Sequence, residues 1–172
     1  TFGAPVVKAV RSATKKVFDV HLMIENPSKY IDKFAKLGVN IIYIHPETDS
    51  HACRTLQMIR DAGVKSGIAV NPGTSFETVK DLLYLCDYVM LMSVNPGFAG
   101  QKYLNFVTEK FKKFVDESDN YGGYDVMIDG ACSSEKIEML SKIGVKGFIL
   151  GTSALFGKDR SYKDIIDELR GL

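Results

Sequence analysis

Residues 35–40, AKLGVN, decide the fold because their pattern recurs along the chain. DAGVK at 61–65 and SKIGVK at 141–146 repeat it: an amphipathic helical pattern ends at a glycine, and an apolar, β-branched run follows. The glycine of each phrase suits the left-handed position that ends many helices. The repeated unit is therefore a helix, a glycine and a strand.

This unit predicts six strands along the chain, at 17–23, 40–45, 65–70, 87–92, 124–128 and 147–150. It predicts helices between them, near 27–37, 50–62, 75–84, 103–118 and 133–143, and two further helices near 4–12 and 161–170. Strand sequences such as VMLM and GFIL lack polar alternation, as expected for parallel strands that are covered on both faces.

Repeated strand–helix units form either an open doubly wound sheet or a (β/α)8 barrel. No G-x-G-x-x-G follows the first strand, which disfavours the dinucleotide-binding version of the open sheet. We therefore expect an α/β fold, a (β/α)8 TIM barrel of which six strands are visible, as a single domain over residues 1–172.

Capping signals mark three helix starts. Asn26-Pro27 predicts an N-cap before a proline at the first helical position. Thr74-x-x-Glu77 predicts a capping box. Ser133 or Ser134 predicts the cap of the helix at 133–143.

Composition excludes several classes of protein. The chain has 172 residues and a net charge of +1, so no bulk field selects nucleic acid or an anionic membrane. No apolar stretch approaches the length of a membrane span, and we expect no signal peptide. The three cysteines have no metal-binding spacing and predict reduced thiols in a cytoplasmic protein.

Ionisable side chains stand where predicted strands end. Asp19, His21 and Met23 alternate on one face of the first strand, and Asp129 follows the fifth. His21 by itself favours a hydrogen-bonded core histidine. Because buried ionisable groups are costly unless paired or metal-bound, His21 together with Asp129 favours a metal site or acid–base chemistry. His45 precedes a proline and either orients a loop or contacts the ligand.

Glycine-bearing loops follow the last three predicted strands. Such loops present bare backbone N–H groups that can hold a phosphate without a charged side chain. One loop is equally compatible with a surface turn, but three together favour a phosphate site near the late strands of a barrel. The candidate phosphate-binding residues are Gly97, Phe98, Ala99, Gly100, Gly130, Ala131, Gly151, Thr152 and Ser153.

The motifs DVHLM, IHPE, LMSVNPGFAGQ, IDG and GTSALF, in that order, closely resemble the ribulose-phosphate 3-epimerase family. The resemblance runs along essentially the whole chain, and LMSVNPGFAGQ is highly specific. It implies a (β/α)8 barrel that interconverts D-ribulose 5-phosphate and D-xylulose 5-phosphate in the pentose phosphate pathway. It also implies one divalent metal ion, with zinc expected first and iron, manganese or cobalt compatible with nitrogen and oxygen ligands. We expect a small-molecule sugar phosphate as the partner, and a homo-oligomer.

The resemblance also implies roles for individual residues. His21 and Asp129 would be two of four metal ligands at the substrate, and Asp129 one of two acid–base carboxylates. Met23 and Met92 would line the floor under the reacting carbons, although methionines are more often core residues. One carboxylate would remove the C3 proton, the metal would stabilise the enediolate, and the other carboxylate would return a proton to the opposite face.

Two departures from the family pattern bear on these roles. Ala131 stands where many relatives have a second glycine, and its N–H can reach a phosphate if its φ stays negative. TFGAPVV at the start follows two strands and a helix in the family, and those strands carry an H-x-D ligand pair and the second catalytic carboxylate. We therefore expect that such a segment precedes residue 1.

Two alternatives stay open at this point. If the chain lacks that segment, it is a non-catalytic sugar-phosphate-binding remnant, or it needs another chain to complete the barrel. Within the enzyme class, the alternative is an allulose-6-phosphate 3-epimerase. The pocket beside His45 would distinguish that enzyme from one that acts on a pentulose phosphate.

Overall fold

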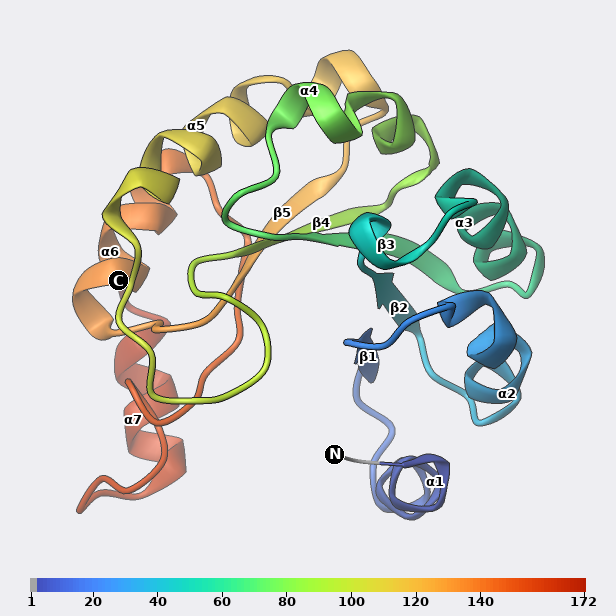
Figure 1. The fold of residues 1–172 in the computed structure, drawn as a ribbon. Coiled ribbons are helices and arrows are strands. Elements are labelled where there is room, and N and C mark those ends of the chain that lie inside the picture. Colours follow the sequence, from blue (N-terminus) through green and yellow to red (C-terminus); the bar gives the residue numbers. More distant parts are fainter. Residues whose placement is uncertain (1–2) are drawn as a thin grey trace.

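The computed structural model describes residues 3–172, and their centre is a six-stranded parallel sheet (Figure 1). Its strands pair in chain order, from β1 to β6. The strands are β1 (Asp19–Leu22), β2 (Ile41–Ile44), β3 (Lys65–Val70), β4 (Tyr88–Met92), β5 (Asp125–Asp129) and β6 (Gly147–Phe148). All six predicted strands are confirmed, and β3 has the predicted bounds. Within the described residues, β1 and β6 form the two open edges of the sheet.

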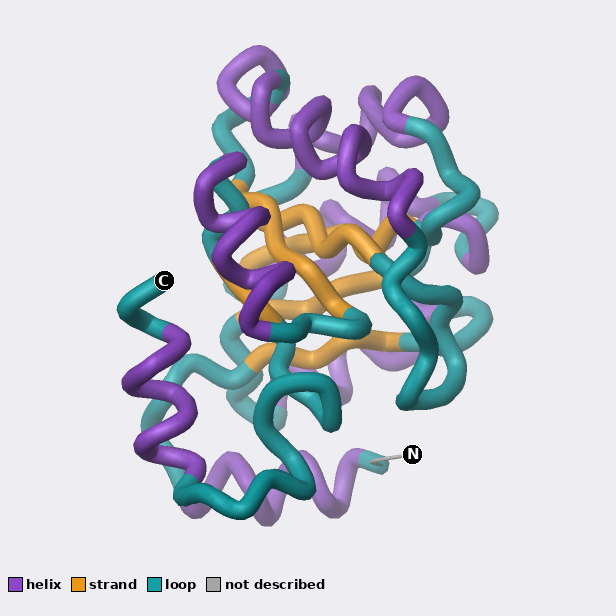
Figure 2. Tube along the Cα trace, turned by 90° about the vertical axis from the view of Figure 1, so that its left-hand side faces the viewer, coloured by secondary structure: helices purple, strands orange, loops and turns teal. Residues whose placement is uncertain are grey.

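Helices cover the outer face of this sheet. α2 (Ile31–Lys36), α3 (Ala52–Asp61), α4 (Phe76–Val79), α5 (Thr108–Asp116) and α6 (Ser134–Ile143) form an arc around it in Figure 1. α1 (Ala4–Ala13) precedes β1, and α7 (Tyr162–Leu169) follows β6. Both lie away from α4 and α5, as Figures 1 and 2 show. No helix within residues 3–172 is long and apolar enough to span a bilayer. Short 3-10 turns lie at Pro27–Tyr30, Pro46–Thr48, Lys80–Leu85, Asn105–Val107 and Ser118–Tyr121.

The two faces of the sheet carry different apolar layers. Ile42, Ile44 and their equivalents on the other strands pack under the helices in the large core. The inner, concave face carries a smaller cluster, and successive residues alternate between the two faces because the side-chain period of a strand is two. This concave-face cluster consists of Ile41, Tyr43, Ala69, Met90 and Met92, with Tyr88 and Met127 packed against it.

Tyr43 fits on the concave face only because a neighbour has no side chain. A Cβ atom on Gly67 would lie 2.5 Å from the Tyr43 ring, so any larger residue on β3 would displace it. The Tyr43 hydroxyl is buried without a hydrogen-bond partner. Burial raises the pKa of Tyr43 above its ordinary value, so this hydroxyl stays neutral.

The helix ends follow the repeat seen in the sequence. Gly38, Gly63 and Gly144 have φ values of +80°, +73° and +112°, the left-handed conformation predicted for them. Ser133 caps α6, because its side chain accepts a hydrogen bond from the N–H of Lys136. These glycines therefore end the helices where the sequence predicted, and a strand follows each of them.

One predicted cap is confirmed in position and another is wrong. Asn26 is the N-cap residue before Pro27, as predicted, but it has φ +52° and its side chain makes no capping hydrogen bond. The Thr74 capping box does not form either: Ser75 caps α4 by accepting from the N–H of Thr78. Thr74 instead donates its hydroxyl to Glu47 at 2.5 Å. A contact between distant loops thus takes the side chain that the local pattern assigned to the helix.

Candidate active site

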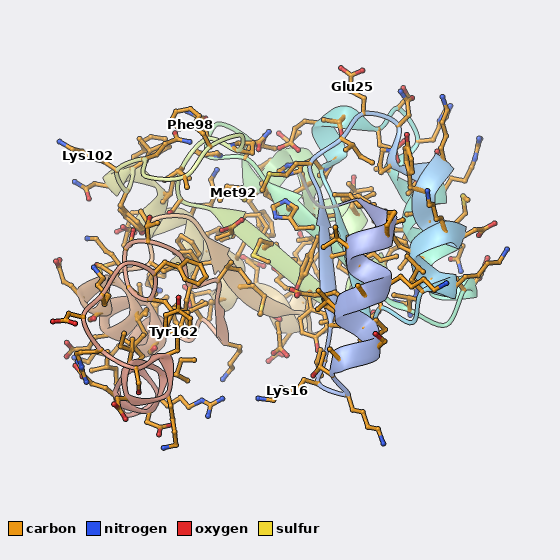
Figure 3. All side chains as sticks on the ribbon, turned by 90° about the horizontal axis from the view of Figure 1, so that it is seen from below. Lys16, Glu25, Met92, Phe98, Lys102 and Tyr162 are labelled. Carbon is orange, nitrogen blue, oxygen red and sulfur yellow. The ribbon has the colours of Figure 1, made fainter. Side chains whose placement is uncertain are left out.

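The carboxyl ends of the strands surround a cavity of about 280 Å³. Figure 3 looks onto the concave side of the molecule, with Met92 near its middle and Phe98 towards the rim. The lining residues come from the loops after β4, β5 and β6, together with two methionines. They are Met23, Met92, Val94, Asn95, Pro96, Gly97, Phe98, Ala99, Gly100, Gln101, Asp129, Gly130, Ala131, Cys132, Ile149, Gly151, Thr152 and Ser153.

This cavity brings together nearly all of the residues selected from the sequence. Every candidate phosphate-binding residue lines it, as do Met23, Met92 and Asp129. Met92 and Asp129 face each other in the register of β4 and β5. His21 is not in the lining but contacts Asp129 from β1. The roles of these residues stay predictions.

The charge of the cavity is unusual for an anion site. Among the described residues that line it, none is a lysine, arginine or histidine, and Asp129 is the sole ionisable carboxylate. The donors that such a wall can offer are backbone N–H groups, the side-chain amides of Asn95 and Gln101, and the hydroxyls of Thr152 and Ser153. Gly97 (φ +134°) and Gly100 (φ +87°) have positive φ values, so the first loop has backbone conformations that favour glycine.

Gly130 lies where a side chain has no room. It has φ +104°, and a Cβ atom there would approach Val94 Cγ2 to 2.6 Å and Ser93 Oγ to 3.0 Å. The loop after β5 can therefore lie against the loop after β4 only with glycine at this position. The close approach forms one wall of the cavity.

Ala131 does not have the negative φ on which its contact with a phosphate was made conditional. Ala131 has φ +44°, in the left-handed region that alanine rarely adopts. The loop turns sharply here, and Ser133 N–H donates to the Ala131 carbonyl at 2.9 Å. The loop geometry thus imposes a glycine-like conformation on an alanine, and Ala131 lines the cavity in that conformation.

His21 stands between a carboxylate and a second histidine. Its Nδ1 lies 3.4 Å from Asp129 Oδ2, and its Nε2 lies 2.8 Å from Nε2 of His45. His45 is 2% exposed, so this contact is shielded from solvent. The two rings are stacked with their centroids 4.9 Å apart. His45 therefore contacts the site through His21.

The His21–Asp129 pair fits part of a metal site. Two ligands of a tetrahedral site with bonds of about 2.1 Å lie about 3.4 Å apart, the separation of these two side-chain atoms. Nitrogen and oxygen donors suit zinc and several other divalent ions. No group of three or more potential ligands occurs within residues 3–172, so the pair could supply only part of a coordination shell.

Glu47 anchors His45 from the outer side. Its carboxylate lies 3.6 Å from His45 Nδ1 and accepts from the N–H of Asn71 and the hydroxyl of Thr74. Burial by itself would raise the pKa of Glu47, but the neighbouring His45 imidazole and hydrogen bonds from Thr74 and Asn71 outweigh it and lower the pKa to about 2. Glu47 is therefore ionised at neutral pH and ties the loops after β2 and β3 together.

Asp19 is two residues before His21 on β1, so the two side chains lie on the same face of the strand. Burial raises the pKa of Asp19, and the neighbouring Asp129 raises it further, while the Asp19 backbone N–H and His21 lower it. A second carboxylate thus lies near Asp129, but Asp19 does not line the cavity. We assign it no part in the reaction.

A family model described as "Ribulose-phosphate 3 epimerase family" matches residues 1–156. The chain belongs to the ribulose-phosphate 3-epimerase family. It is therefore a member of a family of epimerases, which are isomerase enzymes. The resemblance that the motifs indicated is confirmed over nearly the whole chain.

Relatives in this family support the same assignment. The ribulose-phosphate 3-epimerase of Bacillus subtilis is 39% identical over 173 residues, covering 99% of this chain and 79% of the relative. That of Aquifex aeolicus is 39% identical, covering 92% of this chain and 72% of the relative. That of Rhodobacter capsulatus is 37% identical, covering 96% and 72%.

Solved structures support the fold. Two mutants of the tryptophan synthase alpha-subunit from the hyperthermophile Pyrococcus furiosus match 98% of this chain and 72% of theirs. The TM-scores are 0.68 and 0.69, at 19% and 18% identity. At such low identity the likeness concerns the fold of this epimerase-family chain alone, an α/β fold with a parallel sheet and surrounding helices.

Several residues of the site escaped prediction from the sequence. Ser93, Gln101 and Lys110 hold loops around the cavity through hydrogen bonds to backbone carbonyls. No motif or spacing indicates these contacts, because each joins residues whose proximity depends on the folded loops. Cys132 and Ile149 line the cavity as ordinary apolar residues and carried no signal of a site.

Proposed function

We propose that this chain interconverts D-ribulose 5-phosphate and D-xylulose 5-phosphate by moving the proton on C3. One observation carries the proposal: the Asp129 carboxylate stands on the wall of a glycine-lined cavity that offers N–H donors and no cation. A proton-transfer group thus adjoins a pocket suited to a phosphate. Family membership supports the same reaction.

The phosphate end of the substrate binds in the three late loops. Gly97–Gly100, Gly130-Ala131 and Gly151–Ser153 line one continuous cavity, so a single phosphate can contact all three. Backbone N–H groups held in fixed positions bind a phosphate without a charged partner. Anchored there, the substrate extends towards Met92 and Asp129, where C3 lies within reach of the carboxylate.

Asp129 is proposed as one acid–base group. It takes the C3 proton on one face and returns it in the reverse reaction, while Met23 and Met92 exclude water from the reacting carbons. His21, at 3.4 Å from Asp129, fixes the position of that carboxylate. His45 holds His21 in turn, through the contact between their Nε2 atoms.

We propose that His21 and Asp129 also contribute two ligands to a divalent metal ion, zinc first. When bound, such an ion supplies positive charge near the C2 oxygen, where the enediolate charge develops. Inversion at C3 also needs an acid on the opposite face. We propose that this carboxylate comes from the H-x-D segment that precedes TFGAPVV in the family. Two further strands, placed between β6 and β1, would complete a (β/α)8 barrel.

The reaction can be tested by solvent exchange. The purified protein is incubated with D-ribulose 5-phosphate in D2O, and deuterium at C3 of both pentulose phosphates is followed by NMR. We expect incorporation with wild type, and we expect Asp129→Asn to lower kcat by about 10²- to 10⁴-fold. Asp125→Asn, at the exposed start of the same strand, is the matched control and should keep its activity.

Each outcome decides between the alternatives. Near-normal turnover by Asp129→Asn contradicts its acid–base role. Phosphate binding without any exchange identifies a non-catalytic sugar-phosphate-binding protein, and faster turnover of allulose 6-phosphate identifies a hexulose-phosphate enzyme. Treatment with a chelator tests the metal: we expect activity to be lost and then restored by Zn²⁺, Fe²⁺, Mn²⁺ or Co²⁺.

A further inference from the structure

Several backbone carbonyls around the cavity accept hydrogen bonds from other groups in the protein. Ser93 Oγ donates to the Gly130 carbonyl at 2.5 Å. Gln101 Nε2 donates to the carbonyls of Asn95 at 2.6 Å and Phe98 at 3.1 Å. Two hydroxyl or amide side chains therefore bond to three carbonyls of the loops after β4 and β5.

Three further carbonyls at these loops accept hydrogen bonds from backbone N–H groups. Ser93 N–H donates to Asp129 O at 3.0 Å, and Ser133 N–H to Ala131 O. In the loop after β6, Leu155 N–H donates to Gly151 O at 2.8 Å. At least one carbonyl in each of the three loops is thus held by a donor within the protein.

Peptide geometry links each bound carbonyl to a donor on the opposite side. In a trans peptide the C=O and the following N–H point in opposite directions. When Ser93 holds the Gly130 carbonyl, the N–H of Ala131 points the other way. When Gln101 holds the Phe98 carbonyl, the N–H of Ala99 does the same. Both alanines line the cavity.

This orientation decides whether the cavity attracts or repels an anion. With no cationic side chain in the lining, a single peptide flip would replace a donor with a carbonyl oxygen facing the phosphate. We propose that Ser93 and Gln101 are positioning residues, which hold the Gly130 and Phe98 carbonyls so that Ala131 and Ala99 N–H groups face the anion. The inference rests on the phosphate pocket of the proposed function. It names the residues that make this pocket present N–H donors, and not carbonyl oxygens, to an anion.

Ser93 is suited to this role by its burial. It is fully buried at the end of β4, and the Leu104 N–H donates to its carbonyl at 3.0 Å, so its position is fixed. Its hydroxyl reaches Gly130, 37 residues away in the chain. Gln101 is partly exposed and braces its own loop, in which Phe98 lies towards the rim (Figure 3).

The experiment compares binding of inorganic phosphate with turnover. Calorimetry gives the phosphate Kd, and steady-state kinetics give KM and kcat for D-ribulose 5-phosphate. For Ser93→Ala we expect Kd and KM to rise about tenfold, as one lost hydrogen bond to an anion predicts, with kcat within about twofold. Gln101→Met should act in the same direction, and its exposed position leaves folding intact. Ser93→Thr keeps the hydroxyl and should restore phosphate binding.

Ser66→Ala provides the matched control. Ser66 is also fully buried and also donates to a backbone carbonyl, that of Leu85, but it lies at the opposite end of the sheet. It should lower thermal stability and leave the phosphate Kd unchanged.

The results separate this inference from the proposed function. If wild type binds phosphate and both Ser93→Ala and Gln101→Met bind it equally well, the positioning role is wrong while the pocket stands. If wild type binds no phosphate, the pocket and the positioning role fall together.

Discussion

The two sides of the strand rim differ in what they present to a ligand. At the ends of β1 and β2, the groups are titratable side chains: His21, His45 and Glu47 lie in successive contacts of 2.8 to 3.6 Å. At the ends of β4 to β6, the groups are backbone amides in glycine-bearing loops. Proton transfer needs side chains that change charge, whereas holding a phosphate needs donors that stay fixed. The one carboxylate in the cavity lining, Asp129 at the end of β5, lies on the amide side and meets the histidines through its 3.4 Å contact with His21. In the proposed reaction the late loops hold the phosphate, and this contact joins them to the titratable groups.

Gly130→Ala is the strongest challenge to the fixed late loops. A Cβ at 2.6 Å from Val94 Cγ2, added to a left-handed φ, should lower the free energy of unfolding by about 3 kcal/mol. Gly63→Ala has a similar φ of +73° but open space around its Cβ, and should lose only about 1 kcal/mol. Urea unfolding measures both, and equal losses would mean that the crowding carries no cost.

Lys110→Met tests a contact between α5 and the loop that follows β3. From α5, Lys110 Nζ donates to the carbonyls of Asn71, Pro72 and Thr74, which follow β3. Burial lowers the pKa of Lys110, and nearby Glu47 partly offsets this. Removing the ammonium leaves the Pro72 and Thr74 carbonyls without this donor, while the Asn71 carbonyl still accepts from the Thr74 N–H, so we expect a loss of about 2 kcal/mol by urea unfolding. Lys112→Met, which removes only an exposed ion pair on the same helix, should lose less than about 0.5 kcal/mol.

Glu47→Gln tests whether the contacts at the ends of β1 and β2 depend on the charge of the Glu47 carboxylate. The pKa of Glu47 is lowered from 4.5 to about 2 in the folded protein. Its stabilisation is therefore fully present above pH 4.5 and is lost as pH falls towards 2. Because the side chain is partly exposed, we expect wild type to exceed Glu47→Gln by about 1–2 kcal/mol at pH 7, with the gap closing near pH 2.

Thermal unfolding of both proteins at several pH values measures that gap. Glu77→Gln, at an exposed carboxylate of α4, is the control and should show little difference at any pH. A gap of constant size down to pH 2 would show that shape, and not charge, explains the contribution of Glu47.

Ala131→Gly gives the smallest expected effect and the opposite sign. Glycine relieves the left-handed strain at φ +44° but adds backbone entropy to the unfolded chain, so we expect a net gain of about 0.5 kcal/mol. Ala62→Gly, at an ordinary φ of −75°, should instead lose about 0.5 kcal/mol. Calorimetric melting of the pair shows whether the fixed late loops carry strain.

The strand–helix scaffold and the loops around the cavity can both be predicted from local features of the sequence. Strand–helix repeats and the glycines after helices depend on neighbouring residues, so all six strands and the left-handed glycines could be predicted. The late loops could be selected as a group because glycine itself indicates backbone that approaches a ligand. Their residues then proved to share one cavity.

Contacts between distant loops could not be predicted in this way. Thr74 has the spacing of a cap, yet it donates to Glu47 from the preceding loop. Ala131 has the ordinary preference for a negative φ, but the surrounding turn imposes a positive one. Ser93 and Lys110 look like unremarkable polar residues until the loops that they bond to are placed beside them. At Thr74 a contact between loops outweighs the local cap, and at Ala131 the turn that the Ser133 N–H closes outweighs a local preference of about 1 kcal/mol.

The cation-free wall of the cavity has a consequence for ionic strength. Salt screens attraction between net charges over roughly 10 Å at 0.1 M, but it hardly weakens short hydrogen bonds from backbone amides. With a net charge of +1, the chain also has little long-range field to steer an anion inward. Phosphate capture by this protein should therefore vary little with salt concentration, and should proceed at the rate of unassisted diffusional encounter.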